Sequence, residues 1–356
     1  MSSSTLPTSR TTIDAFLATT LQKFYKGGKM QNAVFNANPF TAKMKSGKRV
    51  EYFDGGHAID VNLMYGRNTT VGSYSRYDRY NISPQDGMTT VFYNWAQYVG
   101  TLAIDGFSEW ANSGAGRLIN LLDEKIEQLT MSFSEVLNDN FLDCHVTADS
   151  GATGPGNNGK NTLSLPALVN YTPASGSGKV IAGKDAYTDA YWRNVYKASS
   201  AGSFASLKKE LSNVINTCAR LAGGKRPTML VSDQTTHELY EASMQEQVRY
   251  QSGDTATMGF PALNVKGIPY FYDFMVPDVA GAKNWDESPA KGTIYFLNEN
   301  FLKCAIGKGR DMRPTKWKES DDQEARLMSY YLYIQLMCSN RAKQGVLGNI
   351  DWSIAS

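Results

Sequence analysis

The segment at 154–161 reads GPGNNGKN and comes within one residue of a phosphate-binding loop. Such a loop has the form GxxxxGK followed by Ser or Thr, whose hydroxyl binds magnesium, and it connects a strand to a helix. Asn161 occupies the hydroxyl position, a long helical pattern precedes the segment, and Pro166 disfavours a helix after it. The residues therefore indicate an ordinary glycine-rich loop.

A second motif with possible chemistry, HELYE, lies at 237–241. A zinc protease needs a second histidine at the fifth position, so that two imidazoles share one face of a helix. Glu241 fills that position, and the other histidines, His57 and His145, are far away in the sequence. We interpret the segment as the solvated face of a helix.

No residue has the neighbours that a catalytic nucleophile requires. The sequence contains no GxSxG, and none of its three histidines is placed as a base. The cysteines form no CxxC pair, which disfavours a disulfide framework or a zinc site and fits a reducing compartment; they are Cys144, Cys218, Cys304 and Cys338. Cys218 and Cys338 lie in apolar patterns and are expected in the core. We expect no catalytic residue, no metal site and no cofactor.

Length and composition limit the classes of protein to which this chain can belong. The 356 residues correspond to about two domains, and 42% of them are hydrophobic, which excludes a wholly disordered chain. No apolar run approaches the ~20 residues that span a bilayer, and no apolar segment of a signal peptide follows residues 1–10. The 20 tyrosines and 31 glycines favour a polar, uncharged surface that suits protein–protein contacts.

Charge is distributed unevenly along the chain. Residues 1–50 contain eight Lys or Arg and one acid, Asp14, so this segment carries +7 and the remainder −5. We expect a basic arm that contacts an acidic neighbour or nucleic acid, with a solvated tail as the alternative. The basic residues assigned to this lumen-facing or neighbour-facing surface are Arg10, Lys23, Lys26, Lys29, Lys43 and Lys45.

A segment at 65–87 interleaves tyrosine and arginine with small polar residues, and it has too few apolar residues to form a core element. We predict a long protruding loop or two-stranded ribbon that returns through the apolar stretch at 90–98, and a loop of this length is usually functional. It could stack on single-stranded nucleic acid or contact another subunit. Its candidate contact residues are Tyr65, Arg67, Tyr74, Arg76, Tyr77, Arg79 and Tyr80.

The remaining elements follow from hydrophobic period and from glycine and proline. A short helix is predicted at 12–25 and an extended arm at 31–46, followed by strands at 48–64 around a Gly55–Gly56 turn. Apolar residues every three or four positions predict a long spine helix at 112–142 with an acidic exposed face. Further predicted elements are helices at 204–221 and from Asp233 to about 250, and strands at 228–231, 268–274, 292–296, 302–306 and 326–338.

This order of elements resembles the major capsid protein of tailed double-stranded DNA phages, the HK-ninety-seven-type coat fold. Four segments support the resemblance: VIAGKDAYTDAYWRN at 180–194, PTMLVS at 227–232, GIPYFYDFMVP at 267–277, and the hairpin at 292–307. The similarity extends over nearly the whole chain from about residue 45. The sequence departs from the family in two ways: the protruding loop is richer in tyrosine and arginine than expected, and the N-terminal arm is short.

The resemblance implies an α+β phage major capsid fold with an N-terminal arm, an extended two-stranded loop, a peripheral domain with a long spine helix, and an axial α/β domain. The expected segments are the arm at 1–47, the extended loop and its base strands at 48–105, the peripheral domain at 106–165, the axial domain at 166–307, long peripheral strands at 308–342, and a return to the axial domain at 343–356.

The function implied is a coat protein, not an enzyme, that self-assembles into hexamers and pentamers of an icosahedral head around packaged double-stranded DNA. Expected partners are itself, a portal protein, a separate scaffolding protein, a decoration protein, and DNA without sequence specificity, with no membrane. The expected location is the virion, after assembly in the host cytoplasm. A nucleotide- or metal-dependent α/β enzyme is the alternative, motivated by the two motifs at 154–161 and 237–241.

Three further expectations concern assembly. The loop at 65–87 reaches over a neighbouring subunit, and about 45 residues before the first strands leave no room for a scaffolding domain. The type member of the family links subunits by a bond between a loop lysine and a neighbour's asparagine. Here the loop contains three arginines and no lysine, so we expect a shell that is held non-covalently.

Overall fold

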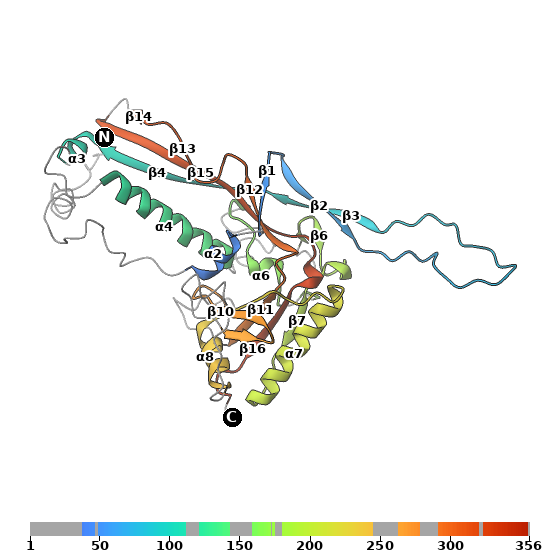
Figure 1. Cartoon of the computed structure of the whole chain (residues 1–356). Helices are drawn as coiled ribbons and strands as arrows, with labels where there is room; N and C mark the ends of the chain where they lie inside the picture. Colours follow the sequence, from blue (N-terminus) through green and yellow to red (C-terminus); the bar gives the residue numbers. More distant parts are fainter. Residues whose placement is uncertain are drawn as a thin grey trace, which may run out of the picture. The chain divides into compact units, whose positions relative to one another are not determined.

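The computed structural model describes residues 38–46, 49–111, 121–142, 159–171, 173–174, 180–244, 263–277, 291–319 and 323–354. The predicted helix at 12–25 and the basic residues Arg10, Lys23, Lys26 and Lys29 lie outside these ranges. The chain divides into two compact units. Unit one comprises Met1–Asn36, Tyr98–Val136 and Gly309–Leu332, and unit two comprises Ala37–Gln97, Leu137–Lys308 and Tyr333–Ser356. Helices and strands are both abundant, so the predicted α+β class is confirmed (Figure 1).

In unit one, strand β4 (Ala96–Asp105) pairs with β15 (Ala325–Cys338), and the helices are α3 (Gly106–Ala111) and α4 (Leu121–Leu142). Buried and exposed residues alternate along β4, which leaves one face of the strand open within the described residues. Gly100 lies against the ring of Phe133, where a larger residue would collide. The described part of the spine helix and the late strand match their predictions. The short strands β13 (Arg313–Pro314) and β14 (Lys318–Glu319) also pair with β15.

The main sheet of unit two has the strand order β7-β16-β11-β8-β10-β9. Every residue of β8 and β11 is buried, as expected for strands covered on both faces. The pairs β16–β7 and β10–β8 are parallel and the other pairs are antiparallel. The strands are β7 (Val195–Ala198), β8 (Met229–Ser232), β9 (Leu263–Val265), β10 (Ile268–Tyr272), β11 (Gly292–Leu297) and β16 (Gly345–Ile350).

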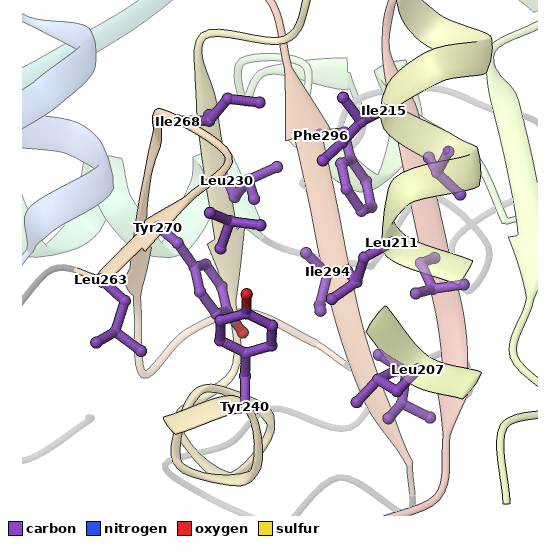
Figure 2. Close-up of a cluster of buried hydrophobic side chains, with 14 of the residues drawn as sticks. Leu207, Leu211, Ile215, Leu230, Tyr240, Leu263, Ile268, Tyr270, Ile294 and Phe296 are labelled. Atoms are coloured by element: carbon purple, nitrogen blue, oxygen red, sulfur yellow. The ribbon is translucent and has the colours of Figure 1, made fainter. Parts of the chain in front are cut away.

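Two capped helices cover one face of this sheet. Helix α7 (Phe204–Leu221) begins at Ser203, whose hydroxyl accepts a bond from the Ser206 amide in a capping box. Helix α8 (Gln234–Ala242) begins at Asp233, whose carboxylate accepts from the Thr236 amide at 2.8 Å, as the sequence predicts. Their apolar side chains meet those of the sheet in one core cluster (Figure 2). No helix in the described part of the chain is long and apolar enough to cross a bilayer.

A second set of elements in unit two forms the base of the 65–87 segment. Strands β2 (Ala58–Met64) and β3 (Met88–Asn94) pair antiparallel over their whole length. Strand β1 (Val50–Phe53) pairs in parallel with β12 (Leu302–Gly307), which pairs antiparallel with the later residues of β15. The small elements nearby are α6 (Leu165–Leu168), β5 (Val180–Ile181), β6 (Lys184–Asp185), and the short 3₁₀ helices η3 (Ala190–Trp192) and η4 (Arg341–Lys343).

The prediction of an extended arm over 31–46 is wrong for part of that range. Residues Pro39–Met44 form helix α2, with Pro39 in its first turn. A proline there loses no hydrogen bond, because the first amides of a helix have no intrahelical partner. Phe40 and Met44 are fully buried, so tertiary packing stabilises a helix that is too short to show a hydrophobic period.

A buried carboxylate joins three distant parts of unit two. Asp273 is fully buried and accepts hydrogen bonds from the amides of Phe40 and Met275 and from Nδ2 of Asn138. The Asn138 Oδ1 in turn accepts from the Thr41 hydroxyl at 2.8 Å. Asp273 therefore connects α2, the end of α4 and the segment after β10, and burial raises its pKa from 3.8 to about 6.

Candidate functional site

The near-phosphate-binding segment has a structural role where it is described. Residues 154–158 lie outside the described ranges, and Asn161 donates from Nδ2 to Oδ1 of Asn140 at 2.8 Å. The next helix, α6, has four residues and starts at Leu165. A phosphate-binding loop instead opens directly into a longer helix whose amides face the phosphate. The described end of the segment therefore ties the chain to α4.

The prediction that 237–241 forms a solvated helix face is wrong for His237. This side chain is 4% exposed and lies between the rings of Tyr270 and Tyr272, at 4.8 and 5.2 Å between centroids. Burial lowers the pKa of His237, which favours the neutral imidazole. Thr236, His237 and Tyr240 form the inward face of α8. Within the described residues, no group of three or more His, Cys, Asp or Glu could hold a metal ion.

The cysteines that the structure describes are unreactive core residues. Cys218, Cys304 and Cys338 are free and buried. Burial raises the pKa of Cys218 to about 12 and that of Cys338 to about 11, so both stay protonated near neutral pH. The prediction that Cys218 and Cys338 belong to the core is confirmed, and Cys144 lies outside the described ranges.

The segment at 65–87 is a long protruding ribbon between β2 and β3, which confirms its predicted shape (Figure 1). It has no backbone ladder, and its outgoing and returning halves meet through isolated contacts. The Tyr65 amide donates to the Gly87 carbonyl at 2.9 Å, and the Thr69 hydroxyl donates to Oε1 of Gln85 at 2.7 Å. Nearer the tip, the rings of Tyr74 and Tyr80 meet edge to face at 5.2 Å.

No residue of this ribbon is buried in the chain itself. Tyr77 at the tip is 97% exposed, and Val71 and Ile82 are 84% and 90% exposed. A contiguous exposed set of large apolar side chains marks an interaction surface in a soluble protein. The three guanidinium groups add positive charge, since none forms an ion pair with a described residue; they belong to Arg67, Arg76 and Arg79.

The base of the ribbon, in contrast, is held firmly within unit two. The Tyr93 hydroxyl donates to the Cys338 carbonyl at 2.6 Å and accepts from the Cys338 amide at 3.2 Å. The Tyr65 ring stacks on that of Tyr191 at 4.7 Å. At Gly183 a side chain would collide with the ring of Phe92, so glycine allows this close approach. The fold therefore fixes where the ribbon starts while leaving its far part without support.

The basic arm is only partly within the described residues. Lys43 lies in α2 and is 4% exposed, so its ammonium is not on the surface of the single chain. Lys45 follows the helix and is half-buried. Arg49 forms an ion pair with Glu299 at 2.8 Å. No residue pattern indicates that Lys43 is covered, because its burial results from the packing of a helix that is too short to be predicted.

Comparison with known proteins identifies the fold. No protein-family model and no curated protein sequence matches the chain. The capsid asymmetric unit of cyanophage A-1(L) matches with a TM-score of 0.64 at 14% identity, over 91% of this chain and 96% of that one. The capsid of a native GTA particle matches with a TM-score of 0.55 at 10% identity, over 92% and 95%.

A third match is the encapsulin SrpI of Synechococcus elongatus PCC 7942 in its holo complex, with a TM-score of 0.56 at 10% identity over 98% of each chain. These similarities extend over nearly the full length of both partners in every case, so they concern the whole architecture and not one shared domain. The predicted architecture is therefore confirmed: the chain has the HK-ninety-seven-type coat fold of tailed-phage capsids.

Proposed function

We propose that the chain is the major coat protein of a tailed double-stranded DNA phage and that it assembles into hexamers and pentamers of an icosahedral head. The observation that carries this proposal is the exposed ribbon at 65–87 on a coat fold that spans the chain. A two-stranded ribbon without its own core is marginally stable at best in water, so it is expected to become ordered by packing on something else. A neighbouring copy is the partner that shell assembly supplies.

The ribbon's composition fits a protein partner better than single-stranded nucleic acid. Tyr74 and Tyr80 pack edge to face, so they do not form the parallel row of ring faces on which successive bases would stack. Tyr, Met and Arg are enriched at the centres of protein interfaces, and apolar Val71 and Ile82 need a desolvating partner.

The open face of β4 and β15 in unit one is our candidate for the neighbour's receiving surface. Val99 is exposed on β4 and Leu327 on β15, whereas Leu102 and Met328 are buried. This face combines Val99 and Leu327 with polar neighbours, a mixture that suits the tyrosines, arginines and aliphatic residues of an incoming ribbon. The contact would be heterologous, because two different surfaces of identical copies meet.

The remaining partners follow from the same proposal. The basic arm at 1–47 would offset phosphates of packaged DNA or contact an acidic neighbour, without sequence specificity. A portal protein, a separate scaffolding protein and a decoration protein complete the set, and the mature location is the virion. The ribbon has arginines and no lysine, so it lacks the amine that an isopeptide bond requires, and we propose a shell without covalent links.

Expression of the full chain followed by sedimentation and electron microscopy tests this function. Closed particles or free hexameric rings support it, and nuclease-protected double-stranded DNA in infected-cell particles supports the phage head. Closed shells that never contain DNA would point to a compartment of the encapsulin kind. Small discrete oligomers that bind nucleotide would instead support the alternative α/β enzyme.

A further inference from the structure

Helix α7 presents only positive charge to its surroundings. Its one carboxylate, Glu210, is buried, where it accepts from the Ser199 hydroxyl at 2.7 Å and pairs with Lys197 at 3.6 Å. The exposed face of the helix and the turn after it carry cations that form no ion pair with any described residue. These cations are Lys209, Arg220, Lys225 and Arg226.

Helix α8 presents the opposite charge. Its described residues include two carboxylates, Glu238 and Glu241, and its last turn holds no basic residue. Glu241 lies in the last turn, where the helix dipole disfavours anions, and Glu238 lies mid-helix, where its carboxylate accepts a bond from Nε2 of Gln234 at 2.8 Å. Lys208 of α7 reaches this end of α8, but its ammonium donates to the Ser243 carbonyl. The dipole favours Arg220 at the end of α7, whereas it disfavours Glu241 at the end of α8.

The two helices lie toward opposite ends of the same sheet. Helix α7 packs on β7 and β16, and α8 packs on β10 and β11. On the shared face of the sheet, the strand order β7-β16-β11-β8-β10-β9 places α7 nearer the β7 edge and α8 nearer the β9 edge (Figure 1). Unit two therefore has a cationic flank formed by α7 and its following turn, and an acidic flank formed by α8.

We propose that the cationic flank of one copy contacts the acidic flank of the next copy around a ring. This inference rests on the proposed function, because a ring of identical copies brings two different flanks of each copy together. Opposite charges on those flanks favour the head-to-tail arrangement and oppose pairing of two like flanks. A second copy of the chain is the partner, and Lys209 and Arg220 are the cations placed opposite Glu238 and Glu241.

Charge reversal tests the contact. The α7-reversed variant carries Lys209→Glu and Arg220→Glu, and the α8-reversed variant carries Glu238→Lys and Glu241→Lys. Each variant places like charges at every contact of a ring, so at low salt we expect at least about tenfold less chain in rings and particles. One chain that carries all four substitutions regains opposite charges and should assemble like the native chain. That recovery also shows that the reversed helices fold.

An equimolar mixture of the two single-flank variants gives a sharper result. At the contacting positions the α7-reversed chain is acidic on both flanks and the α8-reversed chain is cationic on both, whereas Lys225 and Arg226 are the same in every variant. The two variants are therefore expected to alternate around a ring. Alternation closes a ring with an even number of copies and leaves one like-charged contact in a ring with an odd number. We therefore expect the mixture to form hexameric rings and to be depleted in pentamers, as counted by electron microscopy.

Four outcomes would overturn the inference. In the first, the native chain and the α7-reversed chain assemble equally well. In the second, the variant with all four substitutions stays unassembled although its melting profile is native. In the third, α7-reversed shells form in native yield but hold less DNA, which assigns the cationic flank to phosphates. Failure of the native chain to form rings at all would remove the proposed function instead, and with it this contact.

Discussion

Replacing Asp273 by Asn removes a titrating group from the centre of unit two while keeping its shape. The carboxylate accepts bonds from the amides of Phe40 and Met275 and from Asn138. An amide keeps one acceptor oxygen, but its NH₂ group replaces the other. Where that NH₂ faces the Phe40 amide or the Asn138 NH₂, two donors meet, and we expect a pH-independent loss of about 1–3 kcal/mol.

The pH-dependent effect is separate and has a definite sign. Burial raises the folded-state pKa of Asp273 from 3.8 to about 6, so the folded chain holds this proton more tightly than the unfolded chain. Its contribution to the free energy of unfolding is therefore fully present below pH 3.8 and is lost as the pH rises through 6. That difference in pKa corresponds to about 3 kcal/mol, at roughly 1.4 kcal/mol per pKa unit.

Equilibrium unfolding of the unassembled chain in urea, between about pH 4 and pH 7.5, measures this contribution. Most of this contribution is lost within that range, so the free energy of unfolding of the native chain should fall by about 2.4 kcal/mol more than that of Asp273→Asn. Two other buried groups also contribute to the pH dependence of stability: burial raises the pKa of Asp233 and lowers that of His237. Both groups are present in the native chain and in the variant. Their effects on the free energy of unfolding are therefore removed when one free energy is subtracted from the other.

The reasoning fails if the difference between native and variant free energies is constant with pH. A constant difference would show that Asp273 has the same proton affinity in the folded and unfolded chain. Its burial and its hydrogen bonds to α2 and α4 would then not describe the protein in solution. A difference that grows as the pH rises, in favour of the native chain, would contradict the sign directly.

Four further outcomes are expected. Tyr93→Phe leaves the buried Cys338 backbone groups without their side-chain partner and should cost about 1–3 kcal/mol, measured by the urea midpoint. Gly100→Ala places a methyl group 2.9 Å from Cζ of Phe133 and should destabilise unit one by about 1–3 kcal/mol, seen as a lower melting temperature. Deletion of 68–81 should leave a folded chain by circular dichroism that forms no stable shells, and normal particles would refute the role of the ribbon. Boiled particles should run as one band near 39.3 kDa, so a ladder that survives reductant would show covalent links.

Elements with a strong local pattern could be predicted from the sequence. The residues of α7 that face the sheet recur every three or four positions, and the observed helix is Phe204–Leu221. The late strand is apolar enough over its length to be placed at 326–338, against Ala325–Cys338 in the structure. In both cases one extended surface covers the element, and burial on that surface imposes a period that is visible in the residues.

Features that depend on contacts between distant residues could not be predicted. Helix α2 is six residues long, so no period can appear, and Pro39 suggests a break although it stands at the start. Asp273 and Asn138 are 135 residues apart and look like ordinary surface residues in the sequence. His237 and Tyr240 share the inward face of α8, and their spacing of three was the available signal.

The candidate site also has a part that the sequence predicts and a part that it does not. The ribbon at 65–87 was predictable because its residues cannot form a core, which is a local property. The surface that we propose as its receiver belongs to another copy, and a single sequence contains no pattern for a contact between copies. The opposite charges of α7 and α8 became meaningful only when the sheet order placed them at different ends.

A reconstruction by electron microscopy of particles formed by the full chain is the most direct test of the assembly proposal. We predict a closed shell of hexamers and pentamers in which the ribbon at 65–87 of each copy lies on a neighbouring copy, with Tyr77 buried there. The proposal would be contradicted by a chain that stays as small soluble oligomers, or by shells in which the ribbon packs on its own subunit or remains exposed.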